Sequence, residues 1–130
     1  MVTVEIIGGP SFQVKWDAAK MHNAQDALED AFNSQPNPST FTYTLQYYGS
    51  NLGYLVNMIN ETFDTFPSAS NYQPYYFWEF LVNNVASNTG IDNHPINDGD
   101  KITFDFTRYI PAKHANTTME LKHKHKKGLL

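Results

Sequence analysis

Tyrosine and tryptophan side chains carry the strongest chemical signal in this sequence. Aromatic residues make up 15% of the 130 residues, whereas charged residues make up only 17%. A tyrosine pairs a flat apolar ring with a hydrogen-bonding hydroxyl, which suits ring-shaped ligands, sugars and protein surfaces alike. Several such rings fall near the ends of predicted strands and near a long loop, and a nearby asparagine could add a polar contact. The predicted ligand-binding residues are Tyr47, Tyr48, Tyr54, Asn57, Tyr72, Tyr75 and Trp78.

Core packing is the competing interpretation for each of these residues taken singly, and for Trp78 first of all. The cluster as a whole favours a binding surface, because one short helix cannot cover so many rings. Tyr47, Tyr48, Tyr54 and Tyr75 are the residues most expected to contact a ligand.

Acid–base chemistry has little support in the sequence. Asp92 and His94 lie two residues apart in a predicted loop, and Asp98 and Asp100 flank a turn that accounts for both carboxylates. A general acid or base needs a pocket and a suitable pKa, neither of which follows from this spacing. The sequence has no glycine-rich phosphate loop, no HExxH motif and no serine motif with an obvious partner. No catalytic residue and no metal site is predicted, and a non-enzymatic role is favoured.

The charge of the chain is unevenly distributed. The formal net charge is −4, yet Lys122, Lys124, Lys126 and Lys127 lie in the last nine residues, so the rest holds five basic against thirteen acidic residues. An acidic body argues against nucleic acid as a partner, because phosphate binding needs a basic surface. Residues 1–112 are predicted to form one folded domain and residues 113–130 an extended basic tail that is disordered and solvated. Contact of the tail with an anionic surface, or with the acidic body, is the alternative.

Composition also limits the redox and membrane chemistry of the chain. Cysteine is absent, which excludes disulfides, thiolate metal sites and a cysteine nucleophile. No apolar run is long enough to span a membrane, and no signal-peptide pattern opens the sequence. The cell compartment, the oligomeric state and the identity of the ligand do not follow from the residues.

The first third of the chain predicts a hairpin followed by a helix. Apolar residues alternate over 2–7 and 11–16, and Gly8-Gly9-Pro10 between them indicates a turn. Asn23 offers an N-cap, with Asp26 three residues later, and apolar residues then recur at helical spacing as far as residue 33. A start at Asp17 would lengthen this helix by a turn or two.

The remainder of the chain predicts several strands. Alternating patterns over 40–48, 53–59 and 75–82 are typical of strands, and residues 61–74 are expected to form a long surface loop. Asn83-Asn84 can form a tight hairpin turn. Asp98-Gly99 is a further turn signal, and it is followed by a last strand that carries Ile102, Phe104 and Phe106.

This element order predicts an α+β fold, a β-grasp-like mixed sheet with one amphipathic helix packed on one face. The helix buries the side that carries Leu28 and Phe32 and covers only part of the sheet. The other face must then be exposed, oligomeric or ligand-bound, and an exposed aromatic face marks an interaction site.

The order of motifs resembles the C-terminal β-grasp domain of transcobalamin and the small bacterial domains similar to it. The similar segments cover residues 2–107: the opening VTVEI, the helix AQDALEDAF, the strand FTYT, Gly53-Tyr54 to Asn57–Ile59, a Trp-containing strand ending in VNN, and INDGDKITFDF. The family usually carries Val-Asn-Gly at the end of this strand, and this chain has Val82-Asn83-Asn84, so that Asn84 stands in place of the glycine.

The resemblance implies a ligand-facing sheet domain. In transcobalamin-like proteins this domain caps a corrinoid from one side, while a separate helical-barrel domain holds it from the other. No such partner domain is present in this sequence, so no cofactor is predicted and corrinoid binding by this chain alone is not expected. Isolated members are often parts of secreted or surface proteins, which favours an extracellular or cell-surface location.

Two non-enzymatic functions follow from these observations. The favoured one is a binding module that holds a small ring-bearing ligand or glycan on its aromatic sheet face and loops. The alternative is a protein–protein interaction or assembly module, in which the same face or a sheet edge pairs with another chain, including a second copy.

Overall fold

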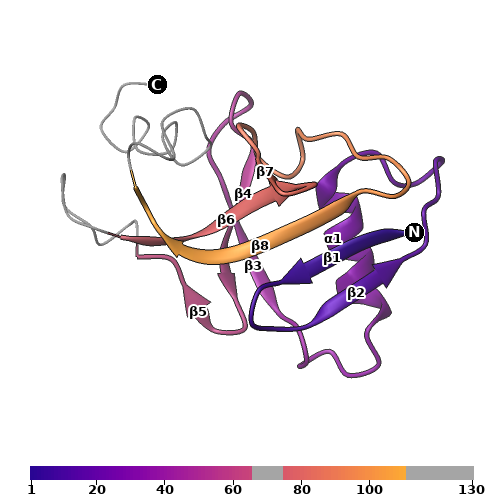
Figure 1. Ribbon diagram of the computed structural model, residues 1–130, viewed down its shortest axis with the longest axis horizontal. Coiled ribbons are helices and arrows are strands. Elements are labelled where there is room, and N and C mark those ends of the chain that lie inside the picture. The colour runs from indigo at the N-terminus through magenta and orange to yellow at the C-terminus, as the bar shows by residue number, and fades with distance from the viewer. Residues whose placement is uncertain (66–74, 111–130) are drawn as a thin grey trace.

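A computed structural model describes residues 1–65 and 75–110, which form one helix and eight strands (Figure 1). The helix is α1 (Ala24–Ser34). The strands are β1 (Val2–Ile6), β2 (Ser11–Val14), β3 (Tyr43–Tyr47), β4 (Tyr54–Ile59), β5 (Thr62–Phe63), β6 (Tyr76–Val82), β7 (Val85–Ala86) and β8 (Lys101–Arg108). Tyr72 and the basic tail at 113–130 lie outside the described residues.

The main sheet has five strands in the order β2-β1-β8-β6-β7. β1 and β2 form the predicted antiparallel hairpin, while β8 pairs with β1 in parallel and with β6 antiparallel. The sheet is therefore mixed, and with α1 lying against it the prediction of an α+β fold is confirmed (Figure 1).

Helix α1 begins at the predicted N-cap. The Asn23 side chain accepts a hydrogen bond from the Asp26 backbone N–H at 3.0 Å, and an Asp26 carboxylate oxygen accepts one from the Asn23 N–H at 3.3 Å. This reciprocal capping box satisfies two backbone donors that the first helical turn leaves free. The longer helix from Asp17 is wrong, because Asp17 instead closes a separate turn in which its carboxylate accepts from the Ala19 N–H.

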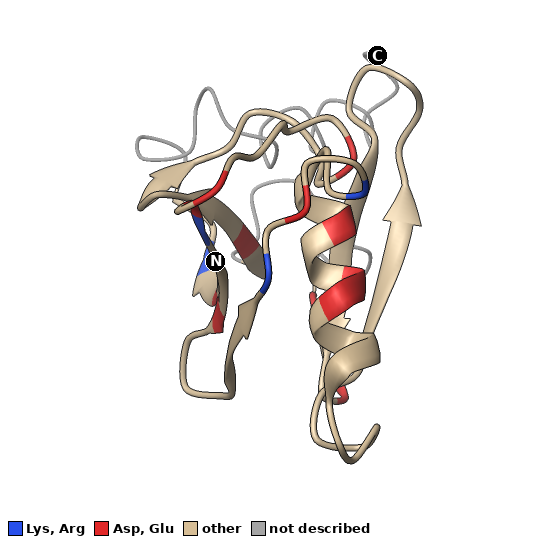
Figure 2. Cartoon of the chain, turned by 90° about the vertical axis from the view of Figure 1, so that its right-hand side faces the viewer, with Lys and Arg blue, Asp and Glu red and all other residues tan. Residues whose placement is uncertain are grey.

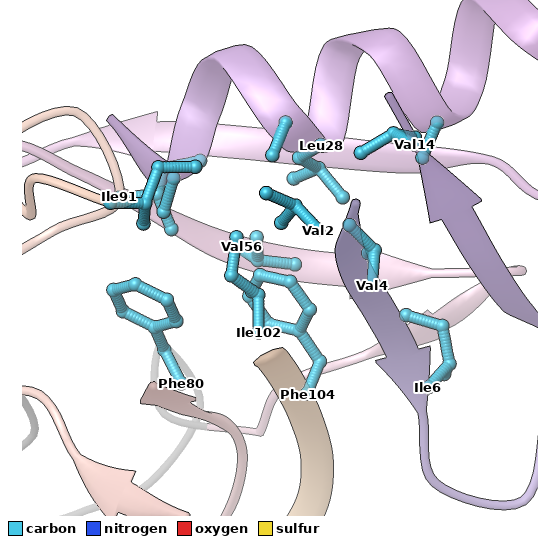
Figure 3. Packing of buried hydrophobic residues seen from close by; sticks show 14 of the residues in the cluster. Val2, Val4, Ile6, Val14, Leu28, Val56, Phe80, Ile91, Ile102 and Phe104 are labelled. Carbon is cyan, nitrogen blue, oxygen red and sulfur yellow. The ribbon is translucent and has the colours of Figure 1, made fainter. Parts of the chain in front are cut away.

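The hydrophobic core lies between α1 and the two sheets. The inner face of α1 buries Ala24, Ala27, Leu28 and Ala31. Figure 3 shows Leu28 close to apolar side chains of β1 and β8, and Val56 of β4 and Ile91 complete the layer. Alternation along β8 places Ile102 and Phe104 on this inner face, where both are fully buried.

A second sheet, with three strands in the order β3-β4-β5, was only partly predicted. β3 starts at Tyr43, later than the expected residue 40, and its pairing with β4 shifts register beside Asn57. The expected loop at 61–74 is wrong at its start, because residues 62–63 form β5 and pair with the end of β4. The turn between β4 and β5 needs positive φ at Asn60 and Glu61, and glutamate is a residue that no turn pattern favours there.

Both predicted turns, the one after β6 and the one before β8, are confirmed. Asn83 and Asn84 adopt φ of 52° and 67° in the two-residue turn between β6 and β7. Gly99 has φ of 90°, and the Asp100 carboxylate accepts hydrogen bonds from the Asn97 N–H at 2.7 Å and the Asn83 side-chain amide at 2.9 Å. These contacts join the two turns at one end of the sheet.

Across residues 1–65 and 75–110, no helix is both long enough and apolar enough to cross a membrane.

Candidate functional site

An exposed pair of tyrosines lies where β3 meets β4. Tyr47 and Tyr54 are directly opposite each other in the register of the two strands, and their ring centroids are 4.7 Å apart with the ring planes 45° apart. Tyr47 is 53% exposed and Tyr54 is 37% exposed. These two residues, called the tyrosine pair below, lie side by side and are both partly exposed to solvent.

The segment from Gly90 to Asp92 holds the tyrosine pair in place through the backbone of β4. The Ile91 N–H donates to the Tyr54 carbonyl at 2.9 Å, and the Tyr54 N–H donates to the Asp92 carboxylate at 2.8 Å. The Gly90 N–H donates to the Leu52 carbonyl at 2.7 Å. The same segment accepts from the N-terminus of α1, where the Gln25 N–H donates to the Ile91 carbonyl at 3.0 Å. The start of β4 is thus fixed on a rigid framework, as a binding platform requires.

Two other predicted binding residues lie in the interior. Tyr48 is buried with Leu52 and Leu55 in a small apolar cluster. Tyr75 is buried with Phe77, and its ring stacks on Tyr109 at 4.9 Å with the planes nearly parallel. Neither ring lies with the tyrosine pair, so burial corrects the expectation of one continuous tyrosine surface.

The remaining predicted residues have structural contacts. The Asn57 side chain accepts a hydrogen bond from the Thr44 hydroxyl at 2.6 Å, across the register shift between β3 and β4. The Trp78 indole N–H donates to the Thr62 carbonyl at 2.9 Å, and its ring packs against the main core. The ligand-binding role of both residues stays a prediction.

A second aromatic group lies at the far end of the main sheet; it contains the predicted residue Trp78, but the contact with Phe106 was missed from the sequence. Trp78 lies 5.0 Å from Phe106, which in turn stacks on Tyr76 at 5.7 Å between ring centroids. Tyr76 is 47% exposed, and Phe63, on the strand that bonds Trp78, is 58% exposed. We call Tyr76, Trp78 and Phe106 the sheet-end cluster. The signal was the alternation along 76–82 and 101–108, but the pairing of β6 with β8 was needed to bring the rings together.

The residues considered for acid–base chemistry have clear structural partners. The Asp92 carboxylate fixes the Tyr54 backbone. Gly53 has φ of 83°, and any side chain there would collide with the Asp92 carboxylate. His94 Nδ1 lies 2.8 Å from the Ser87 hydroxyl, and the imidazole ring packs edge-on against Phe80. His22 is exposed. Among residues 1–65 and 75–110, no three His, Asp or Glu side chains are grouped closely enough to hold a metal ion.

Alkaline pH tests the packing of β3 against α1. Burial, and secondarily the Glu29 carboxylate, raise the pKa of Tyr43 from 10.0 to about 12. The folded state thus retains a proton that the unfolded chain releases near pH 10. The stabilisation by neutral Tyr43 is complete below pH 10 and is lost between pH 10 and about 12. Burial, followed by Asp64, raises the pKa of Tyr48 in the same direction.

We therefore expect the free energy of unfolding to fall as pH rises from 9 to 11.5, and to fall less steeply in Tyr43→Phe. Urea titrations followed by circular dichroism at each pH measure this slope. Identical slopes for the two proteins would contradict the assigned burial of Tyr43.

The fold and these contacts define a small α+β domain with one helix on a mixed sheet. Residues 22–108 match the family model described as a domain of unknown function, DUF4430, and the chain belongs to this family. No curated protein sequence matches the chain. A solved structure similar to it is a Ruminococcus gnavus protein that is described as a candidate metal-binding protein. The similarity has a TM-score of 0.52 and 16% identity over 84% of this chain and 95% of that chain. At this identity the similarity shows a shared fold.

Proposed function

We propose that this domain is a non-enzymatic binding module that holds a small ring-bearing ligand or a glycan on the tyrosine pair. The observation that carries the proposal is the exposure of two adjacent rings on a backbone fixed by Asp92 and by the α1 N-terminus. Buried tyrosines fill cores, whereas Tyr47 and Tyr54 contact each other across the two strands and keep part of each ring exposed, where a ligand can reach it.

The chemistry of the pair favours sugars among ring-bearing ligands. Tyrosine supplies a large, flat contact area at a low cost in conformational entropy, because only two side-chain torsions are fixed on binding. Its hydroxyl adds a hydrogen-bond donor and acceptor at the rim of that area. A sugar ring likewise has apolar C–H faces bordered by hydroxyls, so it matches Tyr47 and Tyr54 in both respects.

The hydrogen bonds of Asp92 and His94 support a non-enzymatic role, since both side chains are engaged in holding the fold. The hairpin, single helix and parallel β1–β8 pair support the relationship to the transcobalamin β-grasp domain inferred from the motifs. A corrinoid is therefore one ring-bearing ligand to test. The Ruminococcus gnavus protein is described as a candidate metal-binding protein. In the described part of this chain, no three carboxylate or imidazole side chains are grouped closely enough to hold a metal ion.

Assembly with a protein partner is the second candidate, and a specific observation favours it. The sheet-end cluster continues the apolar interior to the surface, and the neighbouring Phe63 is the most exposed phenylalanine among the described residues. Contiguous exposed apolar surface is typical of protein–protein contacts. This candidate predicts a mass in solution above the 14.8 kDa of one chain.

Substitution of Tyr54 distinguishes the two candidates. We expect Tyr54→Ala to weaken the binding of a responding oligosaccharide by about tenfold or more, since aromatic anchors commonly contribute over 1 kcal/mol. Tyr76→Ala is the matched control, because it removes another exposed tyrosine from the sheet-end cluster. The measurement is isothermal titration with β-1,4-linked glucose and N-acetylglucosamine oligomers and with cyanocobalamin, alongside light scattering for mass.

Unchanged affinity in Tyr54→Ala together with lost affinity in Tyr76→Ala would move the site to the sheet-end cluster. A stable dimer that Tyr76→Ala dissociates, with no response to any of the three probes, would overturn the ligand proposal and support assembly.

A further inference from the structure

A cleft of about 660 Å³ lies between α1 and the β2–α1 connection. One wall comes from the connection and includes Lys15, Trp16 and Lys20. The other wall is α1, where Glu29 and Asp30 are adjacent and Asn33 follows them by four and three residues, at the spacing of one helix face. No residue of this cleft belongs to either aromatic group described above. Its volume is in the range of small-molecule sites, about 300–1,000 Å³.

Side chains of both charges line this cleft, and none of the ion pairs of the described residues joins them. Within residues 1–65 and 75–110, ion pairs join only the N-terminal amine with Asp98 and Lys101 with Glu5. Lys15 and Lys20 are exposed and have no carboxylate partner in that part of the chain. The connection wall also carries Asp17, whose carboxylate accepts a hydrogen bond from the Ala19 N–H at 3.0 Å, so the two lysines are the groups of that wall left without a partner.

The carboxylates of the helix wall differ in how far the fold already uses them. Asp26 is occupied by the capping box, and Glu29 accepts a hydrogen bond from the Gln25 side chain at 3.1 Å. Asp30 is half-buried, and the structure gives it no hydrogen bond or ion pair within the described residues. Figure 2 shows acidic positions along the outward side of α1. Asp30 is therefore the carboxylate best placed to accept a ligand cation.

Trp16 gives the cleft an apolar surface between the two charged walls. Its ring is partly buried and packs against the main core, which fixes its position. An indole face can stack on a flat ligand or attract a cation within about 6 Å of the ring centroid. A ligand that lay on Trp16 could direct a cationic group toward Asp30 and an anionic group toward Lys15 or Lys20.

We propose that this cleft binds a small zwitterion of the amino-acid type, with an ammonium group, a carboxylate and an apolar side chain. Only a ligand with both charges satisfies both walls, whereas a simple cation leaves the lysines unpaired and a simple anion leaves Asp30 unpaired. Hydrogen bonds between an ammonium group and a carboxylate are stronger than those between neutral groups. The site is independent of the proposed role of the tyrosine pair.

The test uses three probes that share one aromatic body. L-phenylalanine carries both charges, phenethylamine carries only the ammonium group, and 3-phenylpropionate carries only the carboxylate. The two tryptophans of the chain, Trp16 and Trp78, give two indole N–H signals in a ¹H–¹⁵N spectrum, and Trp16→Phe identifies the first. We expect saturable shifts of the Trp16 signal, with phenylalanine binding about tenfold or more tighter than either half.

Two surface substitutions measure the contribution of each wall to binding. Asp30→Asn should weaken phenylalanine and phenethylamine and leave 3-phenylpropionate unchanged, whereas Lys20→Gln should weaken phenylalanine and 3-phenylpropionate only. Asp105→Asn is the control, because it removes one carboxylate from the main sheet, outside the cleft. Equal binding of phenylalanine and phenethylamine, or no saturable shift of the Trp16 signal with any probe, overturns the proposal. A loss of phenylalanine binding in Asp105→Asn equal to that in Asp30→Asn also overturns it.

Discussion

Replacing Phe104 with alanine is expected to lower the free energy of unfolding by about 3–5 kcal/mol. Phe104 is fully buried at the centre of β8, the strand that joins β1 to β6, and its ring stacks on Phe80 at 5.6 Å between centroids. The substitution removes the apolar burial of a whole ring and leaves a cavity that close-packed neighbours refill only in part. Urea denaturation followed by circular dichroism measures the loss. Since small domains are stable by about 5–15 kcal/mol, this loss is a large share of the total.

Phe63→Ala is the matched control for this core prediction. It deletes the same side chain at a position that is 58% exposed, where substitutions usually change stability by about 0.5 kcal/mol or less. A similar loss in both variants would mean that Phe63 is covered in solution by a partner or a second copy. Phe63→Ala therefore also reports on the assembly candidate, provided that its stability is measured at two protein concentrations.

Local patterns in the sequence predicted those elements whose causes are local. The capping box at Asn23 and Asp26, the Gly-Gly-Pro turn and the Asn83-Asn84 turn depend on residues a few positions apart, and the structure confirms each of them. The α+β class followed from the order of these elements alone. β5 was missed because two residues are too few for a periodic pattern and because a glutamate occupies the left-handed turn before it.

The binding surface was harder to predict, because alternation gives the two faces of a strand without saying which is covered. Tyr75 and Tyr76 are adjacent in sequence, yet Tyr75 is buried against Tyr109 and Tyr76 is exposed beside Phe106. Only the long-range pairing of β6 with β8 decides between these outcomes. Tyr47 and Tyr54 are exposed and their binding role stays a prediction, whereas the burial of Tyr48 and Tyr75 away from them was not foreseen.

The cleft at Trp16 was also not predicted from the sequence. Its two walls come from the β2–α1 connection and from one face of α1, and spacing along the chain does not show how these segments approach. The acidic residues of α1 form one wall, and the structure places the lysine-bearing connection beside them.

Replacing Gly90 with alanine is expected to cost about 3 kcal/mol or more and to disturb the tyrosine pair. A Cβ atom on Gly90 would lie 2.5 Å from the carbonyl oxygens of both Leu52 and Tyr54 and 2.8 Å from the Tyr54 nitrogen. These are backbone atoms at the start of β4, so they can yield only if the chain itself moves. Movement there strains the hydrogen bonds from Gly90 to Leu52 and from Ile91 to Tyr54, which hold the first residue of the strand.

The effect of Gly90→Ala should therefore appear in two measurements. The free energy of unfolding falls, and in the remaining folded protein the backbone amide signals of Tyr47 and Tyr54 shift in a ¹H–¹⁵N spectrum. Gly99→Ala is the control, because Gly99 has φ of 90° but open space around its Cα, so alanine adds only a backbone penalty of about 1–2 kcal/mol. Equal losses in the two variants would show that the close approach at Gly90 is not a constraint. A larger loss at Gly90 with shifted Tyr54 signals would show that the segment from Gly90 to Asp92 positions the tyrosine pair, so that stability and ligand binding depend on the same backbone contact.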